Sequence, residues 1–197
     1  MQIAETLWRW TAAHPEWNPQ PEPGSPADWD RMVGSVLYLQ GDAVAVIDPQ
    51  LPSERRGEFL AWLDALIDRR AVSVLTTIRW HRRDRAEILE RYRAGGADAG
   101  AAPGVHPFPL RGAGETVYWI PSAGTLVPGD SLIGDPDGVR VCPESWLADQ
   151  EADRAGLARL LVPLLELPVQ RILVSHGEPV LHAGHEALAR ATQEALR

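Results

Sequence analysis

Two short apolar stretches near the start of the chain have the pattern of paired strands. Residues 33–40 and 43–47 are rich in β-prone side chains and flank Gly41-Asp42, a pair typical of a tight hairpin turn. Residues 54–70 then carry apolar side chains at helical spacing, which predicts a helix with one apolar face. Residues 72–76 predict a short buried strand. A strand, a helix and a strand in this order favour parallel pairing through a right-handed crossover.

The rest of the chain shows the same mixture of patterns. A helix is predicted over residues 84–93, ended by Gly95-Gly96, and residues 97–109 are expected to form a loop with one short strand. Residues 117–120 and 125–127 predict a second hairpin. Further predicted elements are a turn at 135–138, a strand at 171–174, and helices at 151–165 and 184–196. This order indicates an α/β protein with two sheets that helices cover on their outer sides.

The segment before the first predicted hairpin has a different composition. Five prolines lie between residues 15 and 30, and proline lacks the N–H group that the interior of a helix needs. We therefore predict that residues 11–32 form an extended Pro/Trp-rich surface arm, anchored by Trp17 and Trp29. His14 could alternatively place its imidazole in a pocket, but anchoring of the arm is the favoured interpretation.

Length, charge and cysteine content restrict the class of protein. The 197 residues suit one domain over 1–197, and a net charge of -8 argues against nucleic acid and anionic membranes as partners. No apolar stretch approaches 18 residues and residues 1–10 lack a signal-peptide pattern, so neither a membrane span nor secretion is expected. The single cysteine, Cys142, is interpreted as a buried structural thiol. With the missing targeting signal it favours a cytoplasmic location, while the oligomeric state stays undetermined.

Polar residues of the kinds found in catalytic and metal sites follow three of the predicted strands. They lie in the segments 80–84 (Trp-His-Arg-Arg-Asp), 128–131 (Pro-Gly-Asp-Ser) and 175–179 (Ser-His-Gly-Glu-Pro). Sheets in α/β proteins usually place ligands at the carboxyl ends of their strands. We therefore expect the three segments to meet at one site.

These segments, with Ile47-Asp48-Pro49 at the end of a predicted strand, resemble the metallo-β-lactamase fold superfamily. In that family a Thr-His-x-His-x-Asp-His loop follows the strand after the first helix. A later hairpin ends in a Gly-Asp loop whose Asp bridges two metals, and a late strand ends in Gly-His-Gly. The resemblance spans residues 33–190. It implies a four-layer αββα sandwich and descent from metal-dependent hydrolases of esters, thioesters, lactams or phosphodiesters.

The metal-binding residues of that family are only partly present in this sequence. Arg79 stands near the position of the first histidine, His81 matches the second, and Arg85 follows Asp84 where the family has a histidine. One additional residue separates His81 from Asp84. The segment 110–116, which corresponds to a histidine-bearing segment of the family, has no histidine. The remaining candidate residues are His81, Asp84, Asp130 and His176.

One hypothesis is that these residues form a site for a single metal ion. Asp84, Asp130 and His176 would hold one divalent ion (zinc, iron or manganese) with a water in the open position. His81 would lie nearby, and His81 and Asp84 would be the catalytic groups. The protein would then be a mononuclear hydrolase of esters, thioesters or related substrates.

The second hypothesis is a pocket that binds no cofactor and has lost the di-metal hydrolase site. Two buried unpaired carboxylates are unfavourable, so a cation is expected between Asp84 and Asp130. A guanidinium group supplies such a charge together with fixed hydrogen-bond donors. Arg85 is the first candidate and Arg79 the second. The charge balance favours this hypothesis, in which the pocket could bind a small anionic ligand.

Each of the candidate residues also has a purely structural interpretation. Asp84 and Glu87 have the spacing of a capping box at the start of a helix. Asp130 could close a turn through its own side chain, and His176 could hydrogen-bond a loop backbone. The sequence leaves these alternatives open.

Overall fold

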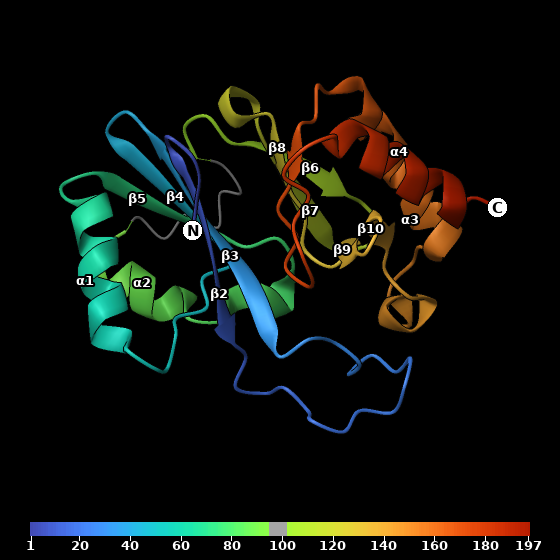
Figure 1. Cartoon of the computed structure of the whole chain (residues 1–197), viewed down its shortest axis with the longest axis horizontal. Helices are drawn as coiled ribbons and strands as arrows, with labels where there is room; N and C mark the ends of the chain where they lie inside the picture. Colours follow the sequence, from blue (N-terminus) through green and yellow to red (C-terminus); the bar gives the residue numbers. More distant parts are fainter. Residues whose placement is uncertain (95–101) are drawn as a thin grey trace.

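The computed structural model describes residues 1–94 and 102–197, in which strands and helices follow one another in mixed order (Figure 1). The first sheet has the strand order β1-β2-β3-β4-β5. Its strands are β1 Gln2–Ala4, β2 Leu7–Ala13, β3 Met32–Gln40, β4 Ala43–Ile47 and β5 Ala71–Leu75. Strands β3 and β4 pair antiparallel, and β4 and β5 pair parallel. The predicted first hairpin and the predicted parallel crossover are therefore confirmed.

Helix α1, Arg56–Ile67, connects β4 to β5 and is shorter at both ends than the predicted helix over 54–70. Arg55 precedes it with φ 53°, and Asp68 follows it with φ 48°. A positive φ is outside the conformation of a right-handed helix, so these two residues set its limits.

The second sheet has the strand order β11-β8-β7-β6. Strands β9 and β10 form a separate two-stranded sheet. The strands are β6 His106–Leu110, β7 Glu115–Ile120, β8 Thr125–Val127, β11 Arg171–Ile172, and β9 Leu132–Asp135 with β10 Gly138–Val141. Strands β7 and β8 pair antiparallel, which confirms the second predicted hairpin. Strand β11 pairs parallel with β8 and is shorter than predicted. The strand expected within 97–109 is β6.

The other α-helices of the described residues are α2 Arg85–Arg91, α3 Arg154–Leu161 and α4 Gly184–Ala195. The helix predicted over 151–165 ends earlier because Pro163 cannot donate a backbone hydrogen bond, and the chain continues as a 3₁₀ turn over Val162–Glu166. Helix α2 corresponds to the helix predicted over 84–93, and the glycines expected to end it, Gly95-Gly96, lie outside the described residues.

Side chains alternate between the two faces of each sheet. In β3, Leu37 packs in a cluster with Leu63 of α1, whereas Tyr38 packs between the sheets with Tyr118 of β7. This alternation follows from the two-residue period of a strand. Helices α1 and α2 therefore cover one sheet, whose other face packs on the second sheet.

A third apolar cluster joins the second sheet to α3 and α4. It includes Leu126 of β8, Leu157 of α3 and Leu188 of α4, all completely buried. The layers run from α1 and α2, through the two sheets, to α3 and α4 (Figure 1). The expected four-layer αββα sandwich is confirmed.

Strand β2 is an element that the sequence patterns do not predict. It pairs with β3 along its whole length, which places its residues 11–13 in the sheet instead of in the arm. Residues 14–31 then form an irregular connection between β2 and β3. Within it, the Trp17 indole N–H donates to the carbonyl of Trp29 at 3.0 Å. This bond joins the two tryptophans to each other within the connection, and their anchoring of a surface arm stays a prediction.

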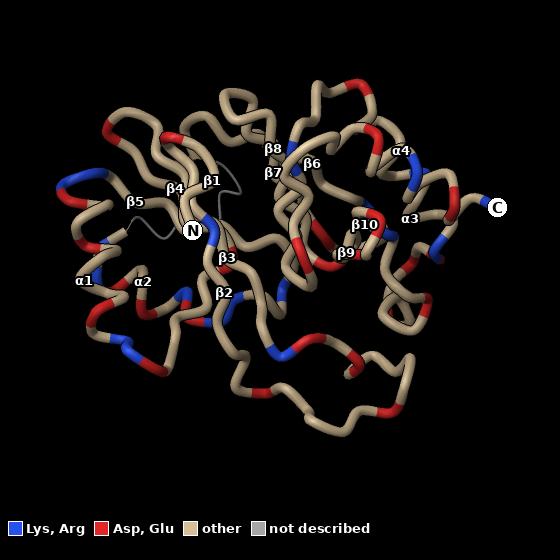
Figure 2. Tube along the Cα trace, viewed as in Figure 1, with Lys and Arg blue, Asp and Glu red and all other residues tan. Residues whose placement is uncertain are grey.

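Other sequence expectations concern the surface and the cysteine. Within the described residues no helix has both the length and the apolar content needed to cross a membrane. Acidic residues and arginines are interspersed along both halves of the molecule (Figure 2). Cys142 is 1% exposed, and burial raises the pKa of its thiol to about 12.

Candidate functional site

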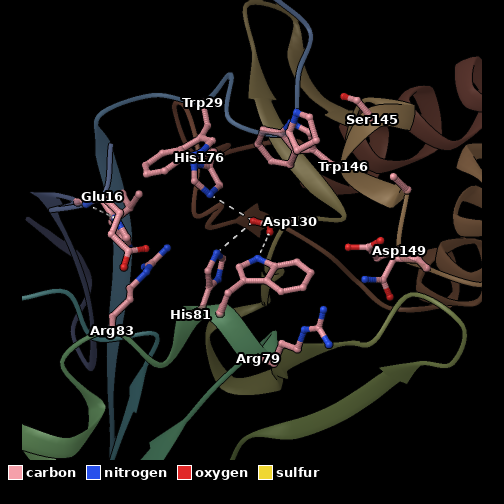
Figure 3. Close-up of a pocket in the computed structure, with 16 residues that line it drawn as sticks. Glu16, Trp29, Arg79, His81, Arg83, Asp130, Ser145, Trp146, Asp149 and His176 are labelled. Atoms are coloured by element: carbon pink, nitrogen blue, oxygen red, sulfur yellow. Dashed lines mark hydrogen bonds and ion pairs between the residues drawn. The ribbon is translucent and has the colours of Figure 1, made fainter. Parts of the chain in front are cut away.

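Three side chains from separate loops meet at one edge of the sandwich. His81 lies in a 3₁₀ turn over Arg79–Arg82 after β5, Asp130 lies between β8 and β9, and His176 follows β11. Each offers one ligand atom, and these atoms all lie within 4.8 Å of one another. Asp130 Oδ1 is 3.1 Å from His81 Nε2 and 3.2 Å from His176 Nε2 (Figure 3). The loops predicted to meet therefore do meet.

The two oxygens of the Asp130 carboxylate have different surroundings. Oδ2 accepts a hydrogen bond from the Trp80 indole N–H at 2.6 Å. Oδ1 is buried and has no well-aligned hydrogen bond among the described residues, despite the two nearby imidazoles. Burial favours a raised pKa for Asp130, but His81 and His176 together hold this pKa well below its ordinary value. The carboxylate is therefore charged, with Oδ1 directed at both histidines.

A second carboxylate fixes the orientation of the His81 ring. Nδ1 lies 3.0 Å from Asp48 Oδ2, and Asp48 also accepts the backbone N–H of Thr77 at 2.8 Å. Burial disfavours the charged imidazole, but the charges of Asp130 and Asp48 outweigh it and raise the pKa of His81 to about 9. The ring is therefore held with Nδ1 facing Asp48 and Nε2 facing Asp130. Sequence analysis identified Asp48 only as the end of a strand, not as part of the site.

Glu115 at the start of β7 holds the loop that carries Asp130. Its completely enclosed carboxylate accepts the backbone N–H groups of Gly129, Asp130 and Ser131 at 2.8–2.9 Å, and the Ser131 hydroxyl at 2.5 Å. Burial raises the pKa of Glu115 to about 7, while these donors favour its charged form. Sequence analysis missed this role. The available signal was a glutamate that begins an apolar strand.

Asp84 lies away from the three-residue group, which corrects the expectation that it converges with Asp130 and His176. Its Oδ2 accepts the backbone N–H of Leu51 at 2.6 Å and the Gln50 side-chain amide at 3.0 Å. The predicted capping box is also absent, since Asp84 makes no side-chain hydrogen bond to its helix. The physical reason is the backbone of Arg83, whose φ of 40° reverses the chain between His81 and Asp84.

The predicted arginine partners of Asp130 are also placed differently. Among the described residues Asp130 makes its close polar contacts with Trp80, His81 and His176, and the guanidinium group whose charge acts on it is that of Arg83, not of Arg79 or Arg85. Arg79 is exposed and lies over the Trp80 ring, 5.3 Å from its centroid. Arg85 begins α2 and is not among the residues that line the cavity beside the site.

A cavity of about 340 Å³ opens beside the three residues. Trp29 from the 14–31 connection and Trp146 pack edge-on against the His176 ring, at centroid distances of 5.6 and 5.3 Å. Trp80 forms a further wall of the cavity. His14 also lines it, as in the alternative interpretation that places this histidine in a pocket. Figure 3 shows the indole rings around Asp130 and His176.

The loop of His176 packs against β9 with no room for a side chain. A Cβ atom at Gly134 would lie 2.4 Å from the backbone nitrogen of Glu178. We expect Gly134→Ala to lower the free energy of unfolding by about 3 kcal/mol, because overpacking of rigid backbone forces the loop to move. Urea denaturation measures this loss.

Gly57→Ala is the matched control for this prediction. A Cβ atom at Gly57 has open space around it, and the residue lies within α1. The control should be as stable as the parent or more so, by up to about 1 kcal/mol. A Gly134→Ala variant of unchanged stability would show that the loop of His176 does not pack tightly against β9.

Comparison with solved structures relates this arrangement to a known fold. A metallo-β-lactamase from Erythrobacter litoralis superposes with a TM-score of 0.64 and 17% sequence identity, covering 99% of this chain and 90% of the other. The chain has the metallo-β-lactamase fold. A metallo-β-lactamase from Pontibacter korlensis gives a TM-score of 0.57 at 14% identity, with 98% and 97% of the two chains covered.

A third solved structure of this fold also superposes on the chain. A metallo-β-lactamase of Erythrobacter litoralis described as a mono-zinc form gives a TM-score of 0.62 at 19% identity, covering 99% of this chain and 94% of the other. No family model and no curated protein matches the sequence. The resemblance stated from the sequence is confirmed as a likeness of fold, at an identity too low to transfer an activity.

Proposed function

We propose that the protein binds one divalent metal ion through His81, Asp130 and His176 and acts as a metal-dependent hydrolase. The observation that carries this proposal is the convergence of the three ligand atoms within 4.8 Å, with the Asp48 carboxylate behind His81. In metal sites a histidine ligand commonly donates its second ring N–H to a carboxylate, which fixes the ring and its tautomer.

The donor set fits such an ion. Ligand bonds of about 2.0–2.1 Å in tetrahedral geometry place neighbouring donor atoms about 3.3 Å apart. Asp130 Oδ1 lies 3.1 and 3.2 Å from the two Nε2 atoms, close to that spacing. Oδ1 is also the carboxylate oxygen that Trp80 leaves without a donor. Two imidazoles and a carboxylate suit zinc, iron or manganese.

The residues around this site suit hydrolysis of a small substrate. A divalent ion there would polarise a carbonyl or phosphoryl oxygen and lower the pKa of water. Trp80 keeps Asp130 in place, and the indoles of Trp29 and Trp146 restrict His176 and exclude bulk water from one side. Arg79 offers an exposed guanidinium at the cavity to an acidic group of the substrate.

A metal-free pocket for a small anion is the second candidate, in which the di-metal site of the fold is degenerate. The observation in its favour is that Asp130 already faces two imidazoles, and its interactions with them hold the pKa of its carboxyl well below the ordinary value. Arg79 and Arg83 also line the cavity, so cationic groups are available to a small anionic ligand. Here the positive charge comes from histidine and Arg83, in place of Arg85 or Arg79 as expected from the sequence.

Metal content separates the two candidates. The protein is purified without chelator, zinc, iron and manganese are measured by elemental analysis, and hydrolysis of ester, thioester, lactam and phosphodiester substrates is assayed. The first candidate predicts about one equivalent of metal and hydrolysis that chelation removes. A protein that takes up no ion, even after incubation with Zn²⁺, but binds acetate or phosphate in calorimetry would support the second.

A further inference from the structure

Arg83 makes contacts that connect the two halves of the sandwich. One terminal nitrogen donates to the carbonyl of Gly34 in β3 at 2.8 Å and to the carbonyl of Asp48 after β4 at 3.1 Å. The other donates to the Ser175 hydroxyl at 2.6 Å, next to His176. A single guanidinium group therefore joins the first sheet to the loop that carries His176.

The backbone supports the same conclusion. Arg83 and Asp48 are both non-glycine residues with positive φ, at 40° and 49°. Side-chain-bearing residues keep such strained conformations only where the surroundings enforce them, and these residues are concentrated at functional sites. The two are joined to each other by the bond from Arg83 to the Asp48 carbonyl. The reversal at Arg83 also turns its side chain toward the cavity and leaves Asp84 on the other side of the loop.

The Arg83 guanidinium group contacts the segments that hold the two histidines in place. His81 comes from the loop after β5, and the side chain of Asp48 orients its ring. His176 comes from the loop after β11, which β3 holds through the hydrogen bond from Gly34 N–H to the Ser175 carbonyl at 2.7 Å. Arg83 contacts the backbone of Gly34 and Asp48 and the side chain of Ser175, and it lies beside the charges of Asp48 and Asp130.

We propose that Arg83 is a positioning residue that sets the separation of His81 and His176 by clamping the His176 loop to the ends of β3 and β4. This inference rests on the proposed function insofar as it concerns metal affinity. The clamp itself is a property of the metal-free protein. In the sequence Arg83 is one of several arginines around His81. Its positive φ distinguishes it from Arg79 and Arg85.

Proton NMR on the metal-free protein tests the clamp without any ion. The rings of His81 and His176 lie 5.8 Å apart between centroids, so an NOE between their ring protons is expected in the parent protein. Arg83→Met should abolish it while the fold persists. Arg171→Met is the matched control, since Arg171 also donates to a backbone carbonyl, Ala123 at 2.7 Å, in a different part of the structure. An NOE that survives Arg83→Met would overturn the proposal.

Zn²⁺ affinity, measured by competition with a chelator, provides the second readout. Arg83→Met should weaken binding by about 10- to 100-fold, the usual effect of removing a group that orients a metal ligand, and Arg171→Met should leave it unchanged. In Arg83→Ala, added guanidinium ion at non-denaturing concentration should restore part of the affinity, which a loss of stability alone would not explain. Equal affinities for parent and Arg83→Met would contradict the proposal.

Two further outcomes keep the inferences separate. A parent protein that binds no Zn²⁺ would refute the proposed function, and the NMR comparison would still decide the role of Arg83. If Arg83→Met does not fold, Arg83→Lys serves instead, because lysine keeps the charge and the apolar stem but cannot reach three partners with a planar fork. A Lys variant with the parent NOE and parent affinity would overturn the clamp.

Discussion

Asp130→Asn is expected to weaken Zn²⁺ binding by at least about 1,000-fold, beyond the roughly 10- to 100-fold effect of removing an outer-sphere partner. The substitution keeps the size of the side chain and removes the negative charge that lies between the two imidazoles. The affinity loss corresponds to about 4 kcal/mol of binding free energy. Competition with a chelator, monitored at equilibrium, gives the two dissociation constants.

Asp149→Asn is the matched control for the charge change. Asp149 lines the same cavity but is exposed and lies outside the three-residue group. Its variant should bind Zn²⁺ within about threefold of the parent, since solvent and salt screen the charge of an exposed side chain. Equal weakening by both substitutions would mean that Asp130 acts only through the general field of the cavity. Unchanged binding in Asp130→Asn would exclude Asp130 as a ligand.

Glu115→Ala is expected to have the largest effect on stability, a loss of about 4 kcal/mol in the free energy of unfolding. The substitution leaves three backbone N–H groups and one hydroxyl without their acceptor inside the protein, and each unpaired buried group costs about 1–3 kcal/mol unless water reaches it. For a chain of this length the melting temperature should fall by about 8–16 °C. Thermal and urea denaturation measure both quantities.

Two variants define the cause of this loss. Glu194→Ala removes an exposed glutamate of α4 and should change stability by less than about 0.5 kcal/mol. Glu115→Gln keeps one acceptor oxygen and places an NH₂ group against the remaining donors, so its stability should not return to that of the parent. A fully stable Glu115→Gln variant would show that size, and not the acceptor pair, is what the loop requires.

The sequence by itself determined those parts of the fold that depend on local patterns. The hairpins β3–β4 and β7–β8 and the crossover from β4 to β5 follow from short apolar runs, turn residues and helical spacing. The meeting of the loops of His81, Asp130 and His176 also follows, because strands of adjoining sheets end at a common edge. Strand β2 was not predicted, although its residues 8–12 alternate between apolar and polar side chains and most of the strand is buried.

Only the tertiary structure decided which carboxylates belong to the site. From the sequence, Asp84 beside the histidine of the loop was the natural candidate, yet Asp48 holds His81 and Glu115 holds the loop of Asp130. The direction of Asp84 depends on the positive φ of Arg83, a conformation that arginine seldom adopts and that no local pattern encodes. The surrounding contacts enforce it, through Gly34, Asp48 and Ser175 from distant parts of the chain. Long-range contacts of this kind exist only after the sheets have packed.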